Sequence, residues 1–89
     1  AHVDDGRLIM AHVLFFGRLR DIAGAGEIAV EDTRSLSALR ARLAAENAAL
    51  GDALAAPGVI VAVDKAIRHD DAALTDDSEV AFMPPLSGG

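Results

Sequence analysis

The chain has 89 residues, enough for one small domain and too few for two. Fourteen acidic and eight basic side chains give a formal net charge of −6, which disfavours binding to nucleic acid or to an anionic membrane. The absence of cysteine excludes disulfides, thiolate metal sites and a cysteine nucleophile, and it fits a reducing cytoplasm. No apolar run approaches the roughly 20 residues that a membrane-spanning helix needs.

The first segment, residues 1–9, is polar and precedes a methionine, Met10. We interpret residues 1–9 as a leader or remnant outside the domain, with an authentic extension as the alternative. Two strands are predicted next. Residues 13–16 are rich in β-forming side chains, and residues 27–31 alternate polar and apolar side chains. We expect these strands to pair antiparallel, with residues 18–23 extending the first strand or forming a turn.

A helix is predicted after Ser35, which stands where an N-cap residue would. Five leucines follow with helical spacing: Leu36, Leu39, Leu43, Leu50 and Leu54. On a helical wheel they fall within roughly 60° of arc, which indicates one amphipathic helix lying on the sheet. We expect Gly51 to end or break this helix, and residues 57–58, Pro-Gly, to form a turn.

The second half of the chain predicts two more strands. Residues 59–67 are apolar on both faces at first, which is typical of a central strand, and residues 79–83 form the last strand. Residues 70–78 form an acidic loop between them. A sheet covered on one face by one helix is the simplest arrangement of these elements, which predicts an α+β roll.

The end of the chain carries the clearest chemical signal. Pro84 and Pro85 close the last strand and stiffen the root of the tail, and Gly88 and Gly89 leave the terminal carboxylate on two residues without side chains. Such an end can thread a narrow tunnel. We therefore expect a domain at residues 10–83 and a projecting tail at residues 84–89.

Two segments resemble the small, sulfur-carrier subunits of molybdopterin synthase, in the ubiquitin-like sulfur-carrier family. They are VLFFGRLRDIAG at residues 13–24 and EVAFMPPLSGG at residues 79–89, and the F-x-P-P-x-S-G-G ending is the most specific part. The resemblance spans residues 10–89. It implies a β-grasp (ubiquitin-like) fold: a mixed sheet covered on one face by one main helix, with a flexible C-terminal Gly-Gly tail.

The resemblance also implies a chemistry centred on Gly89. An ATP-using partner adenylates the Gly89 carboxylate, a sulfur donor converts it to a thiocarboxylate, and the sulfur passes to cyclic pyranopterin monophosphate in the large subunit. The tail residues that would thread into the partner are Pro84, Pro85, Leu86, Ser87 and Gly88. The chain would bind no cofactor itself, would be inactive alone, and would serve as the non-catalytic, sulfur-donating subunit of a heterotetramer.

Strand alternation predicts a docking surface. Val13 and Phe15 point to one face of the sheet and Leu14 and Phe16 to the other, yet one helix covers only one face. Some large apolar side chains should therefore be exposed, as is typical of a protein interface. By resemblance, the positions that contact the large subunit are Phe16, Ile67 and Met83.

Other candidate sites are weaker. We predict no metal site, because none of the histidines has metal-ligand spacing: His2, His12 and His69. The pairs at residues 70–71 and 76–77 lack the ligand pattern of a calcium loop, so we expect a solvated acidic loop. Lys65, the one lysine, is expected to be a strand residue with its amine in water.

Two alternatives to the molybdopterin assignment share the chemistry of Gly89. One is a related carrier for thiazole, cysteine or tRNA thiolation, and the other is a ubiquitin-like modifier of lysines. A third alternative is a plain interaction domain whose Gly-Gly end is incidental.

Overall fold

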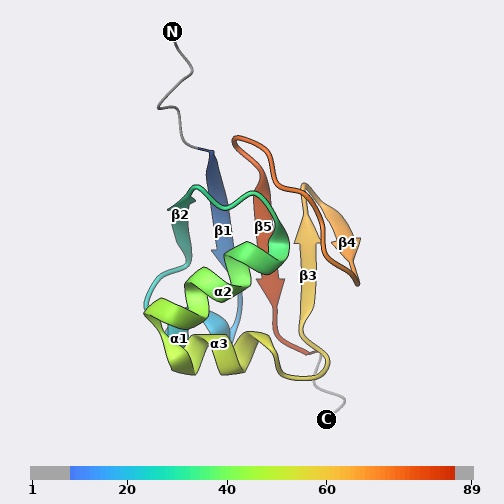
Figure 1. Ribbon diagram of the computed structural model, residues 1–89. Coiled ribbons are helices and arrows are strands. Elements are labelled where there is room, and N and C mark those ends of the chain that lie inside the picture. Colours follow the sequence, from blue (N-terminus) through green and yellow to red (C-terminus); the bar gives the residue numbers. More distant parts are fainter. Residues whose placement is uncertain (1–8, 86–89) are drawn as a thin grey trace, which may run out of the picture.

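The computed structural model describes residues 9–85 (Figure 1). Residues 1–8 of the expected leader and residues 86–89 of the expected tail lie outside this part. No helix within the described residues is long and apolar enough to cross a membrane. The elements in chain order are β1 (Met10–Phe15), α1 (Arg18–Ala23), β2 (Glu27–Glu31), α2 (Leu36–Glu46), α3 (Ala48–Leu54), β3 (Ile60–Val63), β4 (Ala66–Arg68) and β5 (Glu79–Met83).

The five strands form one mixed sheet in the order β2-β1-β5-β3-β4. The β1–β5 pair is parallel and the other three pairs are antiparallel, including the expected β1–β2 pair. The last strand in the sequence is thus the central strand of the sheet. Figure 1 shows α2 and α3 lying across one face, so the α+β roll is confirmed.

The core lies between the sheet and the helices. Alternate residues of β1 and β5 are buried on the helix side, and the rings of Phe15 and Phe82 stack there with centroids 6.0 Å apart. The Arg40 guanidinium lies 5.4 Å from the Phe82 ring centroid and donates a hydrogen bond to the Leu54 carbonyl. All five leucines of the predicted stripe are at most 3% exposed: Leu36, Leu39, Leu43, Leu50 and Leu54.

The helical layer differs from the expected single helix. Ser35 caps α2 as predicted, because its Oγ accepts a hydrogen bond from the Ala38 amide. The break, however, falls at Asn47, whose Oδ1 accepts a hydrogen bond from the Leu50 amide and caps α3. Gly51 lies inside α3 and ends neither helix. It allows close packing of the two helices, because a Cβ atom at Gly51 would lie 2.5 Å from the Cβ of Ala44.

Two further segments differ from the sequence predictions. Residues 18–23 form the short helix α1 and not a strand extension or a turn. Residues 59–67 do not form one strand, because β3 and β4 are joined in a hairpin by Asp64 and Lys65. Both turn residues have positive φ, 49° and 72°, as a type I′ turn requires. Lys65 is therefore an exposed turn residue and not a strand residue.

Replacing Gly51 with alanine tests the helix contact. Overpacking against Ala44 is expected to cost about 1–3 kcal/mol, which outweighs the gain of up to about 1 kcal/mol in helix propensity. Urea denaturation should therefore give Gly51→Ala a lower free energy of unfolding than the unmodified chain. The swapped pair Ala44→Gly with Gly51→Ala keeps the composition and should recover most of the loss. Equal or higher stability of the single variant would contradict this packing.

Candidate functional site

The position of β5 determines where the tail begins. The strand ends at Met83, so Pro84 and Pro85 leave the sheet from its central strand, and both are partly buried. The remaining tail residues lie outside the described part of the chain: Leu86, Ser87, Gly88 and Gly89. The threading of the tail and the chemistry at Gly89 therefore stay predictions.

The sheet face opposite the helices, here called the open face, carries the other set of alternate residues. In β1 these include Leu14 and, by continued alternation, Phe16, whose amide donates a hydrogen bond to the Phe82 carbonyl. In β5 the register places Ala81 next to Leu14, and it places Met83 next to Ile60 of β3. Ile67 of β4 pairs with Ala62, which in turn pairs with Ala81.

These residues form one apolar surface, the open-face patch, which consists of Leu14, Phe16, Ile60, Ile67, Ala81 and Met83. Phe16 is 46% exposed and Ile67 is 59% exposed, and Met83 is partly exposed. The expectation of exposed apolar side chains on this face is confirmed, although neighbouring Phe82 belongs to the core. Contact of Phe16, Ile67 and Met83 with a partner stays a prediction.

The open-face patch lies at the same end of the sheet as the tail root. Because β1 and β5 run parallel, Phe16 follows the end of β1 beside the end of β5, where Pro84 begins. The contact residues predicted from the sequence were Phe16, Ile67 and Met83, and they did not include Leu14, Ile60 or Ala81. Strand alternation already placed Leu14 on the face of Phe16, but the position of Ile60 required the strand order.

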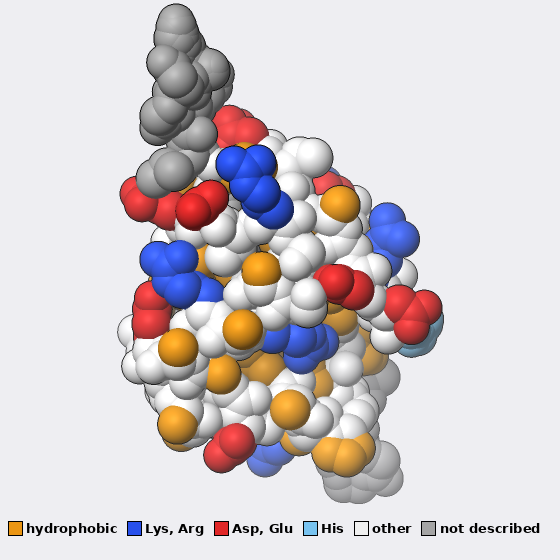
Figure 2. Space-filling model, viewed as in Figure 1, with side chains coloured by type: hydrophobic (Ala, Val, Ile, Leu, Met, Phe, Trp, Pro, Cys, Tyr) orange, Lys and Arg blue, Asp and Glu red, His pale blue; other side chains and the backbone are white. Residues whose placement is uncertain are grey.

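The helix side of the molecule has a different character. Figure 2 shows hydrophobic side chains there as small, separate groups among charged ones. Exposed alanines of α2, such as Ala41 and Ala45, contribute to this side. Scattered small apolar groups are normal on a protein surface, so the open face is the better candidate for docking.

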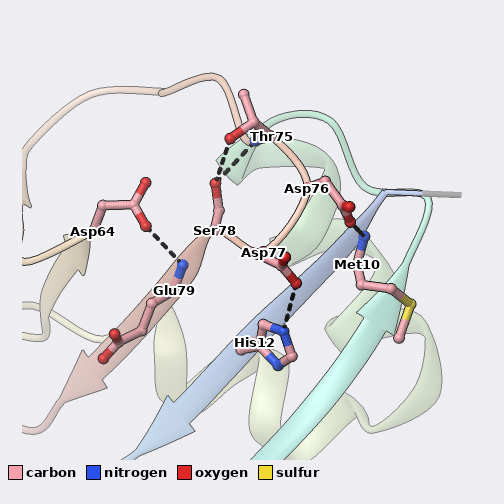
Figure 3. Close-up of polar contacts among 8 residues, drawn as sticks. All are labelled: Met10, His12, Asp64, Thr75, Asp76, Asp77, Ser78 and Glu79. Atoms are coloured by element: carbon pink, nitrogen blue, oxygen red, sulfur yellow. Dashed lines mark hydrogen bonds and ion pairs between the residues drawn. The ribbon is translucent and has the colours of Figure 1, made fainter.

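The last part of the acidic loop, residues 76–78, lies at the opposite end of the sheet, where its side chains fix the starts of strands (Figure 3). Asp76 Oδ1 accepts a hydrogen bond from the Met10 amide, and Asp77 Oδ1 lies 3.2 Å from His12 Nε2. Asp64 of the hairpin turn accepts a hydrogen bond from the Glu79 amide at 2.9 Å. The carboxylates of the loop are exposed as expected, although Leu74 and Ser78 of the same loop are buried. These carboxylates also have structural roles that the sequence did not reveal.

Asp71 caps the N-terminus of α2. Its Oδ1 accepts a hydrogen bond from the Ser37 amide at 2.8 Å, and its Oδ2 accepts one from the Ser37 hydroxyl at 2.9 Å. These bonds to Ser37, the amide bond first, lower the pKa of the Asp71 carboxyl, and the Ala72 amide adds to the effect. Among residues 9–85, no group of three or more His, Asp or Glu side chains could hold a metal ion.

The fold is the ubiquitin-like β-grasp. A solution structure of small archaeal modifier protein 1 from Methanosarcina acetivorans matches with a TM-score of 0.80 at 21% identity, covering 94% of this chain and 100% of that one. A solved Haloferax volcanii protein matches with a TM-score of 0.78 at 27% identity, covering 100% of this chain and 94% of that one.

Sequence comparison gives the family. The ThiS family model matches residues 13–89. The Escherichia coli molybdopterin synthase sulfur carrier subunit is 39% identical, over 90% of this chain and 100% of that protein. The Haemophilus influenzae protein of the same name is 32% identical, over 90% and 100% respectively. The chain belongs to the ThiS family.

Acid denaturation tests the role of Asp71. Its pKa is lower in the folded chain, so the ionised carboxylate stabilises the fold above the unfolded value, about 3.9, and this contribution is lost as pH falls through the folded pKa. Asp71→Asn should therefore lose free energy of unfolding near neutral pH, and the difference should shrink in acid. Urea denaturation over a pH series measures this. Asp70→Asn, which removes the same charge one residue away, is the control, and equal pH profiles for both variants would refute the assignment.

Proposed function

We propose that this chain is the sulfur carrier of molybdenum cofactor synthesis and that the Gly89 carboxyl group carries the sulfur. The observation that supports this most strongly is the family match, which extends to residue 89 and so includes the terminal Gly-Gly. The names of the Escherichia coli and Haemophilus influenzae relatives point to the same role. The open-face patch lies beside the tail root, as expected for a carrier that must bind its partner and present its C-terminal sulfur at the same time.

The proposed chemistry follows from the properties of a carboxylate. A carboxylate is a poor electrophile because oxide would be its leaving group, so one Gly89 oxygen first attacks the α-phosphorus of ATP and releases pyrophosphate. Hydrosulfide from a donor then adds at the acyl carbon of the adenylate and expels AMP. The product is a thiocarboxylate, which is ionised and nucleophilic at neutral pH. A chain without cysteine can carry sulfur in this form.

Partner enzymes supply the rest of the reaction. An adenylating enzyme binds ATP and magnesium, and the large subunit of molybdopterin synthase binds cyclic pyranopterin monophosphate, to which two carriers in turn deliver sulfur. This chain contributes the reacting group and the surfaces that position it, and it is inactive alone. Its charge of −6 favours encounter with partners whose phosphate-binding sites are basic.

Docking through the open-face patch is tested with Ile67→Asp. A charge placed in the desolvated centre of an interface should raise the dissociation constant for the large subunit at least about tenfold. Because Ile67 is 59% exposed in the free chain and lies on an edge strand, the free energy of unfolding should fall by no more than about 1 kcal/mol. Ala45→Asp, which adds the same charge on the helix side, is the matched control. Isothermal titration calorimetry that gives equal affinities for both variants would exclude this docking face.

The carrier role is tested by intact mass. The chain should become heavier by the sulfur-for-oxygen difference when incubated with the adenylating enzyme, magnesium ATP and sulfide, and the variant without Gly89 should not. Adding the large subunit with cyclic pyranopterin monophosphate should return the mass to its starting value. A heavier species that survives this addition would assign the carrier to another pathway, such as thiazole or tRNA thiolation. If no heavier species forms, the terminal Gly-Gly is incidental.

A further inference from the structure

The root of the tail is flanked on both sides by glycines. Because β5 lies between β1 and β3, the chain that leaves it passes between the β1–α1 connection and the α3–β3 connection. Gly17 lies in the first connection against the ring of Pro84, and Gly58 lies in the second against Pro85. A Cβ atom at Gly17 would lie 2.7 Å from Pro84 Cγ, and one at Gly58 would lie 2.9 Å from Pro85 Cβ.

Both glycines also have backbone conformations that other residues rarely adopt. The φ angle is +58° at Gly17 and +87° at Gly58. Each position therefore combines a left-handed backbone with a close approach to a proline ring. A larger residue would have to displace the ring, which belongs to the backbone of the tail root and is not the end of a flexible side chain.

Because the residues in contact with Gly17 and Gly58 are prolines, these contacts restrict the direction of the backbone. Each ring fixes φ near −65°, and each proline keeps the preceding residue extended, so the backbone from Met83 to Pro85 has little freedom. In the first connection, the Phe16 amide donates a hydrogen bond to the Phe82 carbonyl and the Arg20 amide donates one to the Gly17 carbonyl. In the second, the Val59 amide donates a hydrogen bond to the Ala56 carbonyl. The two rings, held on both sides, therefore fix the direction of the backbone at Pro84 and Pro85.

We propose that Gly17 and Gly58 form a proline seat that aims the C-terminal tail relative to the open-face patch. They are positioning residues, and this role rests on the proposed function. A partner bound to the patch can receive Gly89 only if the tail leaves the domain in the right direction. Misplacement by about 1 Å can cost on the order of a hundredfold in rate. The seat therefore acts on the chemical step and not on docking.

The kinetic test uses Gly17→Ala and Gly58→Ala in the adenylating enzyme assay with magnesium ATP and sulfide. We expect kcat for thiocarboxylate formation to fall about tenfold or more, with KM for the carrier within about twofold of the unmodified chain. Gly24→Ala is the control for a positive φ without a close contact, because Gly24 has a φ of +80° but a Cβ there would meet nothing within 4 Å. Its kcat should match that of the unmodified chain.

Reciprocal variants separate the ring contact from backbone strain. Pro84→Ala alone should lower kcat, because the ring that restricts the backbone is lost. It also removes the Cγ atom that Gly17→Ala would strike, so the double variant should lose less kcat than the two single losses combined. If Gly17→Ala does not fold, Gly58→Ala and Pro84→Ala test the seat from its other components. Folded Gly58→Ala and Pro84→Ala variants with kcat equal to that of Gly24→Ala would overturn the proposal.

A spectroscopic test needs no partner enzyme. The chain has no cysteine, so Ser87→Cys places one nitroxide label in the tail. Paramagnetic broadening at the open-face patch, including Phe16 and Ile67, should change with Gly58→Ala and stay the same with Gly24→Ala. An unchanged pattern in Gly58→Ala would refute the seat. If the unmodified chain never forms a thiocarboxylate, the proposed function fails, and the broadening pattern still decides whether the seat aims the tail.

Discussion

The insertion of β5 between β1 and β3 is the constraint on which the rest of the structure depends. Parallel pairing with β1 and antiparallel pairing with β3 fix the register, which places Phe82 inside against Phe15 and the next residue, Met83, outside. A one-residue slip would exchange these two side chains and put an aromatic ring in water. The same register that completes the core therefore also builds the open-face patch and brings the tail root to the middle of the sheet.

Much of this fold is visible in the sequence because burial imposes a period on it. The alternation in residues 27–31 and the leucine stripe each reflect one buried face, and both were predicted correctly. The errors occur where a few local atoms decide the outcome. Asp64 and Lys65 adopt a turn that usually requires Gly or Asn, and the Asn47 side chain caps a new helix where the leucine spacing continues unbroken. A helix as short as residues 18–23 gives too few turns for a clear period.

In the candidate site too, features that follow from strand alternation were predicted, and features that depend on long-range contacts were not. Exposure of Phe16 followed from alternation and from the single helical layer, because a sheet covered on one face leaves the other face open. The contacts of Gly17 with Pro84 and of Gly58 with Pro85 could not be predicted, because a glycine in a connection indicates only a turn. The strand order determines which segment, distant in the sequence, packs against that turn. Residues that support a site through long-range packing are therefore the ones that sequence patterns miss.

The side chains at the starts of the parallel strands β1 and β5 differ from those at their ends. At the end where these strands start, Asp76 and Asp77 bond to Met10 and His12, so charge stabilises the strand starts and stays in water. At the end where they finish, Phe16, Met83 and two prolines lie together, and the exposed charged residues of α1 follow directly after the β1–α1 connection. A partner that covers the open-face patch takes mainly apolar side chains out of water, which keeps the desolvation cost of docking low. Under the proposed function, this arrangement lets a small domain bind its partner through an apolar surface beside its own reactive terminus, while the carboxylates at the starts of the strands stay in water.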